Sequence, residues 1–201
     1  MFTGTYTAIV TPFKNGQLDE AALAQLVKHQ VKGGVDGIVP VGTTGESPTV
    51  DTDEHIRIIE LSVKFAAGKI KVLAGTGANS TSEAIVLTKA AEGVGADGSL
   101  QVAPYYNKPT QEGLYQHFKA IADVSPKPVL LYNVPSRTGR NVDATTILRL
   151  AQLPNIAGIK EAGSDMAQCA LVLRDRPSDF LVVSGDDALS FPQVATGMHG
   201  V

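Results

Sequence analysis

The sequence has little cysteine, no long hydrophobic run and no excess of positive charge. Its 201 residues include one cysteine, Cys169, so an internal disulfide framework is excluded and a reducing compartment is indicated. No apolar stretch reaches the length of a transmembrane helix, and residues 1–12 lack the pattern of a signal peptide. The formal net charge of −3 provides no basic surface for nucleic acid. These absences predict a soluble, cytoplasmic protein without a nucleic-acid or membrane partner.

Patterns typical of metal or dinucleotide sites are also missing. Asp186 and Asp187 are adjacent, but no histidine or third carboxylate lies nearby at ligand spacing, which favours helix capping over a metal. Gly75-Thr76-Gly77 lacks the third glycine of a dinucleotide fingerprint and is better explained as a tight turn. We therefore expect no metal and no cofactor. The four histidines also have no spacing that suggests zinc: His29, His55, His117 and His199.

Short apolar runs alternate with amphipathic stretches from one end of the chain to the other. Helix starts are indicated by capping residues at Asp19, Asp51, Ser80 and Asp143. Seven strand–helix units in strict alternation predict a parallel sheet covered by helices. The apolar runs are residues 6–10, 37–41, 70–74, 99–103, 128–131, 156–162 and 180–183.

The alternation fits either a doubly wound sheet or an α/β fold of the (β/α)8 TIM-barrel type. Polar residues follow almost every run, as in barrel enzymes, and Thr11-Pro12-Phe13 is unlike a Rossmann phosphate loop. An eighth run begins at residues 198–201, where the sequence ends. We therefore predict a single barrel domain over residues 1–201, truncated at the start of strand eight and part of a longer protein. Such a barrel leaves edges on strands one and seven.

Within the run 156–162, the apolar residues Ile156 to Ile159 end on Lys160, which is the strongest candidate for chemistry. A lysine held at an apolar interior loses hydration, which favours the neutral amine that can form a Schiff base with a carbonyl. The alternative is an ordinary strand-end lysine whose stem packs on the core while its head reaches water. This run alone leaves both interpretations open.

Other strand ends carry groups that suit a small acid as substrate. Gly42-Thr43-Thr44-Gly45-Glu46 offers hydroxyls and backbone N–H groups to an anion, or forms an ordinary turn. Tyr105, Tyr106 and Tyr132 follow strands four and five and can relay protons or simply pack the barrel mouth. Arg137 lies in a predicted polar loop, where it can bind a carboxylate or remain solvated.

Five motifs, in this order, resemble the dihydrodipicolinate synthase family of pyruvate-dependent class I aldolases. The resemblance covers all 201 residues. It implies an enzyme that condenses pyruvate with L-aspartate 4-semialdehyde in the diaminopimelate pathway of lysine biosynthesis, without a cofactor. The motifs are Gly42-Thr43-Thr44-Gly45-Glu46, Tyr105-Tyr106-Asn107, Tyr132-Asn133-Val134-Pro135-Ser136-Arg137-Thr138-Gly139, Gly158-Ile159-Lys160-Glu161-Ala162 and Ser184-Gly185-Asp186-Asp187.

The resemblance also implies roles for single residues. Lys160 forms the Schiff base with pyruvate. A proton relay consists of Tyr132, Thr43 and Tyr106, with Tyr106 donated across a tight dimer interface. The substrates are bound by three further residues: Thr44 for the pyruvate carboxylate, Arg137 for the carboxylate of the semialdehyde, and Gly185.

Regulation and assembly follow from the same resemblance. The family forms homotetramers, and its barrel is followed by a helical C-terminal domain that this sequence does not include. Pro48 and Thr52 depart from the lysine-sensitive pattern, where alanine and histidine are found, so we expect weak or absent feedback inhibition. The positions that match the family's lysine effector site are Ser47, His55, Asn79, Glu83 and Tyr105.

Two alternative functions remain open at this point. The first is a related aldolase, such as an N-acetylneuraminate or 2-keto-3-deoxy sugar-acid lyase; these relatives typically lack the arginine matched by Arg137. The second is a non-catalytic barrel homologue, which has no need of a strand-end amine with phenols beside it.

Overall fold

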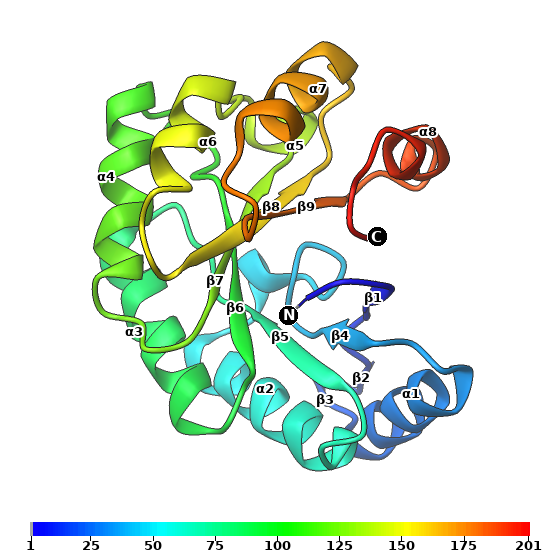
Figure 1. Cartoon of the computed structure of the whole chain (residues 1–201). Helices are drawn as coiled ribbons and strands as arrows, with labels where there is room; N and C mark the ends of the chain where they lie inside the picture. The colour runs from blue at the N-terminus through cyan, green and yellow to red at the C-terminus, as the bar shows by residue number, and fades with distance from the viewer. Residues whose placement is uncertain (1) are drawn as a thin grey trace.

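A curved parallel sheet forms the centre of the protein and helices cover its outer face (Figure 1). The computed structural model describes residues 2–201. Neighbouring strands follow one another in chain order without reversal, as in a (β/α)8 barrel and unlike a doubly wound sheet. The predicted fold class is confirmed. The strands are β1 (Tyr6–Ala8), β4 (Gly37–Val39), β5 (Lys71–Gly75), β6 (Gly98–Val102), β7 (Val129–Asn133), β8 (Ile156–Glu161) and β9 (Leu181–Ser184).

The helices begin where the capping pattern predicts. Asp19 accepts a hydrogen bond from the backbone of Ala22 at 2.9 Å, and Asp51 and Ser80 cap the next two long helices in the same way. Asp143 precedes its helix but accepts a bond from Asn141 instead of capping. The helices are α1 (Glu20–Gly33), α2 (Thr52–Ala66), α3 (Thr81–Gly93), α4 (Gln111–Ala122), α5 (Pro135–Thr138), α6 (Ala144–Leu150), α7 (Met166–Asp175) and α8 (Ser190–Ala195), with a 3-10 turn at Ser47–Thr49.

Two short elements differ from the sequence prediction. The region around Arg137, predicted as a polar loop, contains the single-turn helix α5, which Pro135 starts with its fixed φ. A hairpin of β2 (Phe13–Lys14) and β3 (Gln17–Leu18) precedes α1, where no strand was predicted. Asn15 and Gly16 form its turn with φ of 54° and 77°, a conformation that this residue pair favours.

The last residues of the chain lie between β9 and β1, where an eighth strand begins in a closed barrel. The backbone N–H of Ser184 donates to the carbonyl of Gly200 at 2.9 Å, and that of Tyr6 donates to Val201 at 2.8 Å. Gly4 and Gly200 form an isolated parallel bridge. Gly4 and Gly200 therefore meet beside β1, and the predicted start of an eighth run is in place. The predicted unpaired edges of strands one and seven are partly covered by these last residues.

Strand alternation divides the core into two layers. On β7, Val129 and Leu131 face the helices, whereas Leu130 and Tyr132 face the barrel interior. The same alternation turns Ile159 outward. Lys160 therefore points toward the interior, which is the placement that a catalytic amine requires.

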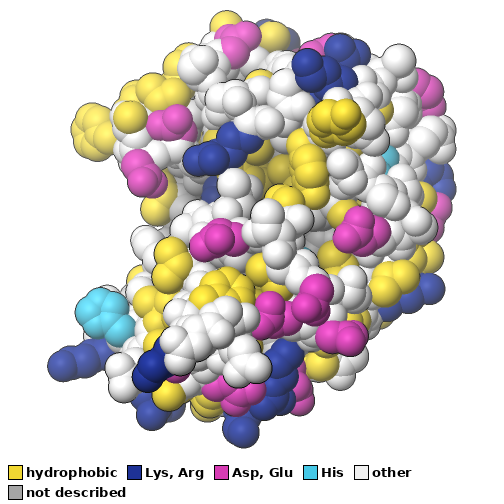
Figure 2. Space-filling view, turned by 180° about the vertical axis from the view of Figure 1, so that it is seen from behind, with side chains coloured by type: hydrophobic (Ala, Val, Ile, Leu, Met, Phe, Trp, Pro, Cys, Tyr) yellow, Lys and Arg dark blue, Asp and Glu magenta, His cyan; other side chains and the backbone are white. Residues whose placement is uncertain are grey.

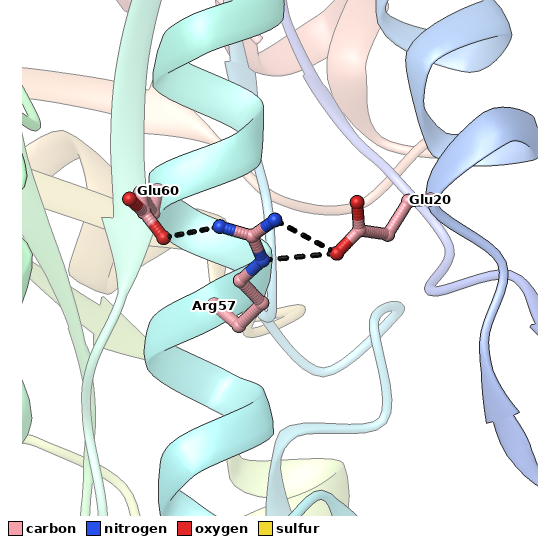
Figure 3. Close-up of polar contacts among 3 residues, drawn as sticks. All are labelled: Glu20, Arg57 and Glu60. Atoms are coloured by element: carbon pink, nitrogen blue, oxygen red, sulfur yellow. Dashed lines mark hydrogen bonds and ion pairs between the residues drawn. The ribbon is translucent and has the colours of Figure 1, made fainter.

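Ion pairs on the outside connect neighbouring helices. Arg57 on α2 contacts Glu20 on α1 and Glu60 one turn along its own helix, both within 2.9 Å (Figure 3). All three side chains are about half exposed, so solvent screens these pairs and they contribute little to stability. Acidic and basic side chains are interspersed on the face shown in Figure 2. Within the described residues, no helix is both long and apolar enough to cross a membrane.

Candidate active site

Lys160 lies at the carboxyl end of β8 with its side chain in a cavity of about 610 Å³. The side chain is only partly exposed. Burial lowers the pKa of the Lys160 amine below its ordinary value of 10.5, and the nearby charge of Asp187 acts in the opposite direction. The net direction follows the larger effect, loss of hydration, and increases the fraction of neutral nucleophile.

Tyr132 is the direct neighbour of Lys160 across the sheet. The register pairs the two residues on β7 and β8, and the Lys160 Nζ lies 4.8 Å from the centre of the Tyr132 ring. Burial raises the pKa of the Tyr132 phenol, while a hydrogen bond with Thr43 and the charge of Arg137 act to lower it. The phenol is therefore protonated at neutral pH and able to donate a proton.

Gly185 is needed for the position of Lys160. A Cβ atom at Gly185 would lie 2.8 Å from Cε and 2.9 Å from Cγ of Lys160, which is closer than carbon atoms can approach. The absence of a side chain at the end of β9 thus leaves the channel in which the lysine stem extends. The backbone N–H of Gly185 donates to the carbonyl of Glu161 at 2.7 Å and fixes this approach.

The remaining predicted substrate-binding residues line the same cavity. Thr43 and Thr44 follow β4, and Arg137 lies on α5 after β7. Thr44 and Arg137 are exposed, so both are free to meet a ligand at the mouth. Val41, two residues before Thr43, has φ of 49°, a costly conformation for a β-branched side chain. The surrounding structure holds Val41 in this conformation, which sets the path of the turn that carries the two threonines.

Tyr106 is the one predicted catalytic residue that this chain does not bring to the cavity. Its side chain is 90% exposed, and its backbone has φ of 72°. The neighbouring Tyr105 turns inward instead and lines a smaller cavity of about 220 Å³ that shares Thr43, Tyr132 and Arg137 with the first.

The residues that match the effector site also lie together. A separate cavity of about 280 Å³ is lined by all five of them and by the two departing positions, Pro48 and Thr52. Within it, His55 Nε2 contacts the carbonyl of Gly75 at 2.8 Å, and burial lowers the pKa of the His55 ring. The five are Ser47, His55, Asn79, Glu83 and Tyr105.

A buried polar network behind the cavity was not predicted. Asn133 and Glu161 immediately follow Tyr132 and Lys160, and alternation turns them to the opposite face of the sheet. Asn133 Nδ2 donates to both carboxylate oxygens of Glu161 at 3.0 Å, and the N–H of Gly163 donates at 2.6 Å. Burial raises the pKa of Glu161, and these donors act against it. The sequence signal was available: each polar residue stands next to a candidate catalytic one at a strand end.

This network also holds the loop behind Arg137. Asn133 Oδ1 accepts from the backbone of Val142 at 3.0 Å, and Asn141 bonds both Asn133 and Gln168. The ends of β7 and β8 are thereby tied to the segment that follows α5. Within residues 2–201, no group of three or more histidine, cysteine, aspartate or glutamate side chains is placed to hold a metal ion.

Comparison with known proteins identifies the family of this chain. A sequence profile of the Dihydrodipicolinate synthetase family matches residues 1–201. The chain belongs to this family. A relative from Leptospira biflexa, named 4-hydroxy-tetrahydrodipicolinate synthase, is 52% identical over 201 residues, which are 100% of this chain and 68% of that protein. The predicted family and the synthase class of enzyme are confirmed.

Two solved structures of the dihydrodipicolinate synthetase family share the fold. The crystal structure of dihydrodipicolinate synthase from Aquifex aeolicus has a TM-score of 0.98 and 48% identity, and it is matched over 100% of this chain and 69% of its own. The chloride-inhibited enzyme from Acinetobacter baumannii, complexed with pyruvate, has a TM-score of 0.96 and 47% identity, with 100% and 69% of the chains covered.

Proposed function

We propose that this protein is a 4-hydroxy-tetrahydrodipicolinate synthase that condenses pyruvate with L-aspartate 4-semialdehyde through a Schiff base on Lys160. The observation that carries the proposal is the Lys160 amine, partly buried, lowered in pKa and placed beside Tyr132 in one cavity. Membership of the family and the names of its relatives agree with this activity. The Acinetobacter relative was solved with pyruvate.

The reaction begins with attack of the neutral Lys160 amine on the keto carbon of pyruvate. The resulting carbinolamine loses water and becomes a protonated imine. The Tyr132 phenol and the Thr43 hydroxyl transfer the protons that this loss of water requires. The exposed backbone of the turn at Thr44 holds the pyruvate carboxylate. The imine then accepts the electron pair left when a proton leaves the methyl group, giving an enamine.

The second substrate enters at the mouth of the cavity. Arg137 binds the carboxylate of L-aspartate 4-semialdehyde through a charge-assisted pair of hydrogen bonds. The enamine carbon attacks the aldehyde carbon and forms the new carbon–carbon bond, and the aldehyde oxygen takes a proton from the Tyr132 phenol and becomes a hydroxyl. The amino group of the semialdehyde, once it has lost its proton to solvent, then attacks the imine carbon, closes the ring and displaces Lys160, which returns as a free amine.

Trapping of the imine tests this function directly. The full chain is incubated with pyruvate and borohydride, and the labelled peptide is located by mass spectrometry. We expect one adduct, on Lys160, and none in the Lys160→Met variant. An adduct on another lysine, or none, would contradict the mechanism. Turnover is then measured with the reductase of the next step as a coupled assay.

Arg137 distinguishes the proposed substrate from those of related aldolases. Replacement of Arg137 by alanine removes a carboxylate partner, so turnover with aspartate semialdehyde should fall by about tenfold to a hundredfold. The rate of cleavage of sugar acids whose aldehyde portion carries no carboxylate should not fall in parallel with this turnover. Pyruvate adduct formation on Lys160 serves as the control for folding, because Arg137 is not involved in that step.

Assembly belongs to the same proposal. The exposed Tyr106 side chain fits a role in the proton relay of a second copy of this chain, within a tight dimer and a homotetramer of the complete protein. Residues 1–201 form its catalytic barrel domain. We place the protein in the cytoplasm, because the buried thiol of Cys169 is free and reduced thiols are typical of that compartment.

We further propose that lysine inhibits this protein only weakly or not at all. The cavity that holds Glu83 and His55 offers an acidic group for an ammonium, but Pro48 removes a backbone donor and Thr52 replaces the imidazole of the lysine-sensitive pattern. Titration of turnover with lysine tests this point. Strong inhibition at low lysine concentration would contradict it.

A further inference from the structure

Strand β8 does not alternate regularly along its length. Ile156 and Ile159 both pack in the outer layer against the helices, although they stand three positions apart. A regular strand would point such a pair to opposite faces, because successive side chains alternate. The register with β7 shifts by one residue after Val129, and this shift leaves Ala157 without a partner of its own on that strand. Ala157 is therefore the extra residue of a β-bulge.

The bulge decides which way Lys160 points. In the observed register Lys160 pairs with Tyr132, and both side chains line the same cavity. A regular continuation of the first pair of β7 and β8 would instead place Lys160 opposite Asn133, on the outer face. A slip of one residue turns every following side chain to the other side of the sheet. The direction of the catalytic amine therefore depends on what holds the bulged register.

Asn133 and Glu161 make the side-chain contact that holds this register at the carboxyl ends of the two strands. They are the pair that follows Tyr132 and Lys160. Asn133 Nδ2 donates to both carboxylate oxygens of Glu161 at 3.0 Å, and both side chains are at most 4% exposed. The backbone N–H of Ala162 also donates to the carbonyl of Asn133 at 2.8 Å. Any other register would separate these buried groups, which is costly.

We propose that Asn133 and Glu161 are positioning residues, which hold β8 in the bulged register and so keep Lys160 beside Tyr132. This inference rests on the proposed function, since it concerns the amine and the phenol assigned there. Both positioning side chains face the outer layer, where Asn133 meets the segment after α5. They therefore act through the preceding residue of their own strand. A displacement of about 1 Å at a reacting group can lower a rate by about a hundredfold.

An exchange of donor and acceptor tests the pair. Glu161→Gln sets an amide N–H group against Asn133 Nδ2, whereas Asn133→Asp sets two carboxylates face to face. The double variant that combines both changes again has one donor opposite one acceptor. In each single variant the maximum rate of borohydride trapping of pyruvate on Lys160 should fall by at least about tenfold. The double variant should recover to within about threefold of the unaltered protein.

The dependence on pyruvate concentration separates positioning from a general loss of structure. The turn at Thr44, which holds the pyruvate carboxylate in the proposed reaction, follows a different strand. The half-saturating pyruvate concentration should therefore change by less than about threefold while the maximum rate falls. The matched control is Thr88→Val, which removes a bond of 2.8 Å from Gln101 Nε2 in another buried network. Urea unfolding should show lower stability in this control, and its trapping rate should stay unchanged.

Four results would each overturn the positioning role. They are unchanged trapping in both single variants, an effect on the half-saturating pyruvate concentration alone, equally slow trapping in Thr88→Val, and a double variant that is unfolded or no faster than the single ones. If a single variant does not fold, the double variant still decides, because the restored hydrogen bonds must restore both folding and trapping. Absence of a pyruvate adduct on Lys160 in the unaltered protein would instead overturn the proposed function.

Discussion

Tyr132 and Lys160 occupy paired positions on adjacent parallel strands, with the lysine Nζ 4.8 Å from the centre of the phenol ring. A ring face favours the charged ammonium, whereas burial favours the neutral amine. The pKa of Lys160 is lowered, so burial is the larger effect. The same geometry places a phenol hydroxyl where protons must move while the amine reacts.

The first prediction separates the ring of Tyr132 from its hydroxyl. Tyr132→Phe keeps the ring beside Lys160 but removes the proton donor, so turnover should fall by about a hundredfold and the pyruvate adduct should form more slowly. Steady-state kinetics and borohydride trapping measure the two effects. Tyr132→Ala, which removes the ring as well, should slow trapping further. Unchanged turnover in Tyr132→Phe would exclude the hydroxyl from proton transfer.

The second prediction concerns the pH dependence of adduct formation. The nucleophile is the neutral amine, which is lost as pH falls through the pKa of Lys160. Because burial lowers this pKa, the acidic limb of the trapping rate should lie below pH 10.5, the ordinary lysine value. Asp187→Asn removes the charge that raises the pKa, so the limb should shift to still lower pH. A shift to higher pH would contradict this placement of Asp187.

A third prediction tests the close approach of Gly185 to the lysine stem. In Gly185→Ala, the new methyl group would stand 2.8 Å from Lys160 Cε, so the lysine must leave its observed position. We expect the trapping rate to fall by at least about tenfold, since a small displacement of a reacting group is enough for such a loss. Gly33→Ala is the control, because a Cβ there meets no atom within 4 Å. Equal trapping rates in both variants would show that Lys160 has room to move.

The sequence was informative wherever a residue's role follows from its place on a strand or helix end. Seven strands, the caps at Asp19, Asp51 and Ser80, and the barrel class all followed from periodicity and capping chemistry. The inward direction of Lys160 and Tyr132 followed once strand ends were assigned. Local chemistry fixes these features, so a single sequence reveals them.

Features that depend on partners distant in the chain were not predicted. The Asn133–Glu161 contact joins residues 28 positions apart, and it becomes visible only when β7 and β8 are paired in register. The left-handed backbone of Tyr106, with φ of 72°, was likewise not predicted from its sequence context. The β2–β3 turn is different, since Asn15-Gly16 is a hairpin signal that was present and not used.

The last prediction concerns His117, a buried ring away from the active site. Its Nδ1 contacts Thr81 Oγ1 at 2.8 Å, its Nε2 is buried without a partner within residues 2–201, and its side chain is 5% exposed. Protonation would add a second N–H donor with no acceptor. Burial accordingly lowers the pKa of His117 from 6.5 to about 4.

A folded-state pKa below the unfolded one gives stability that is present above pH 6.5 and is lost as pH falls toward 4. At about pH 5 this histidine alone should reduce the free energy of unfolding by about 2 kcal/mol relative to about pH 7.5. Urea unfolding at the two pH values measures the change. His117→Gln should remove that part of the acid destabilisation, whereas the same change at exposed His29 should not. Equal pH dependence in the unaltered protein and His117→Gln would mean that the ring is hydrated in the folded protein.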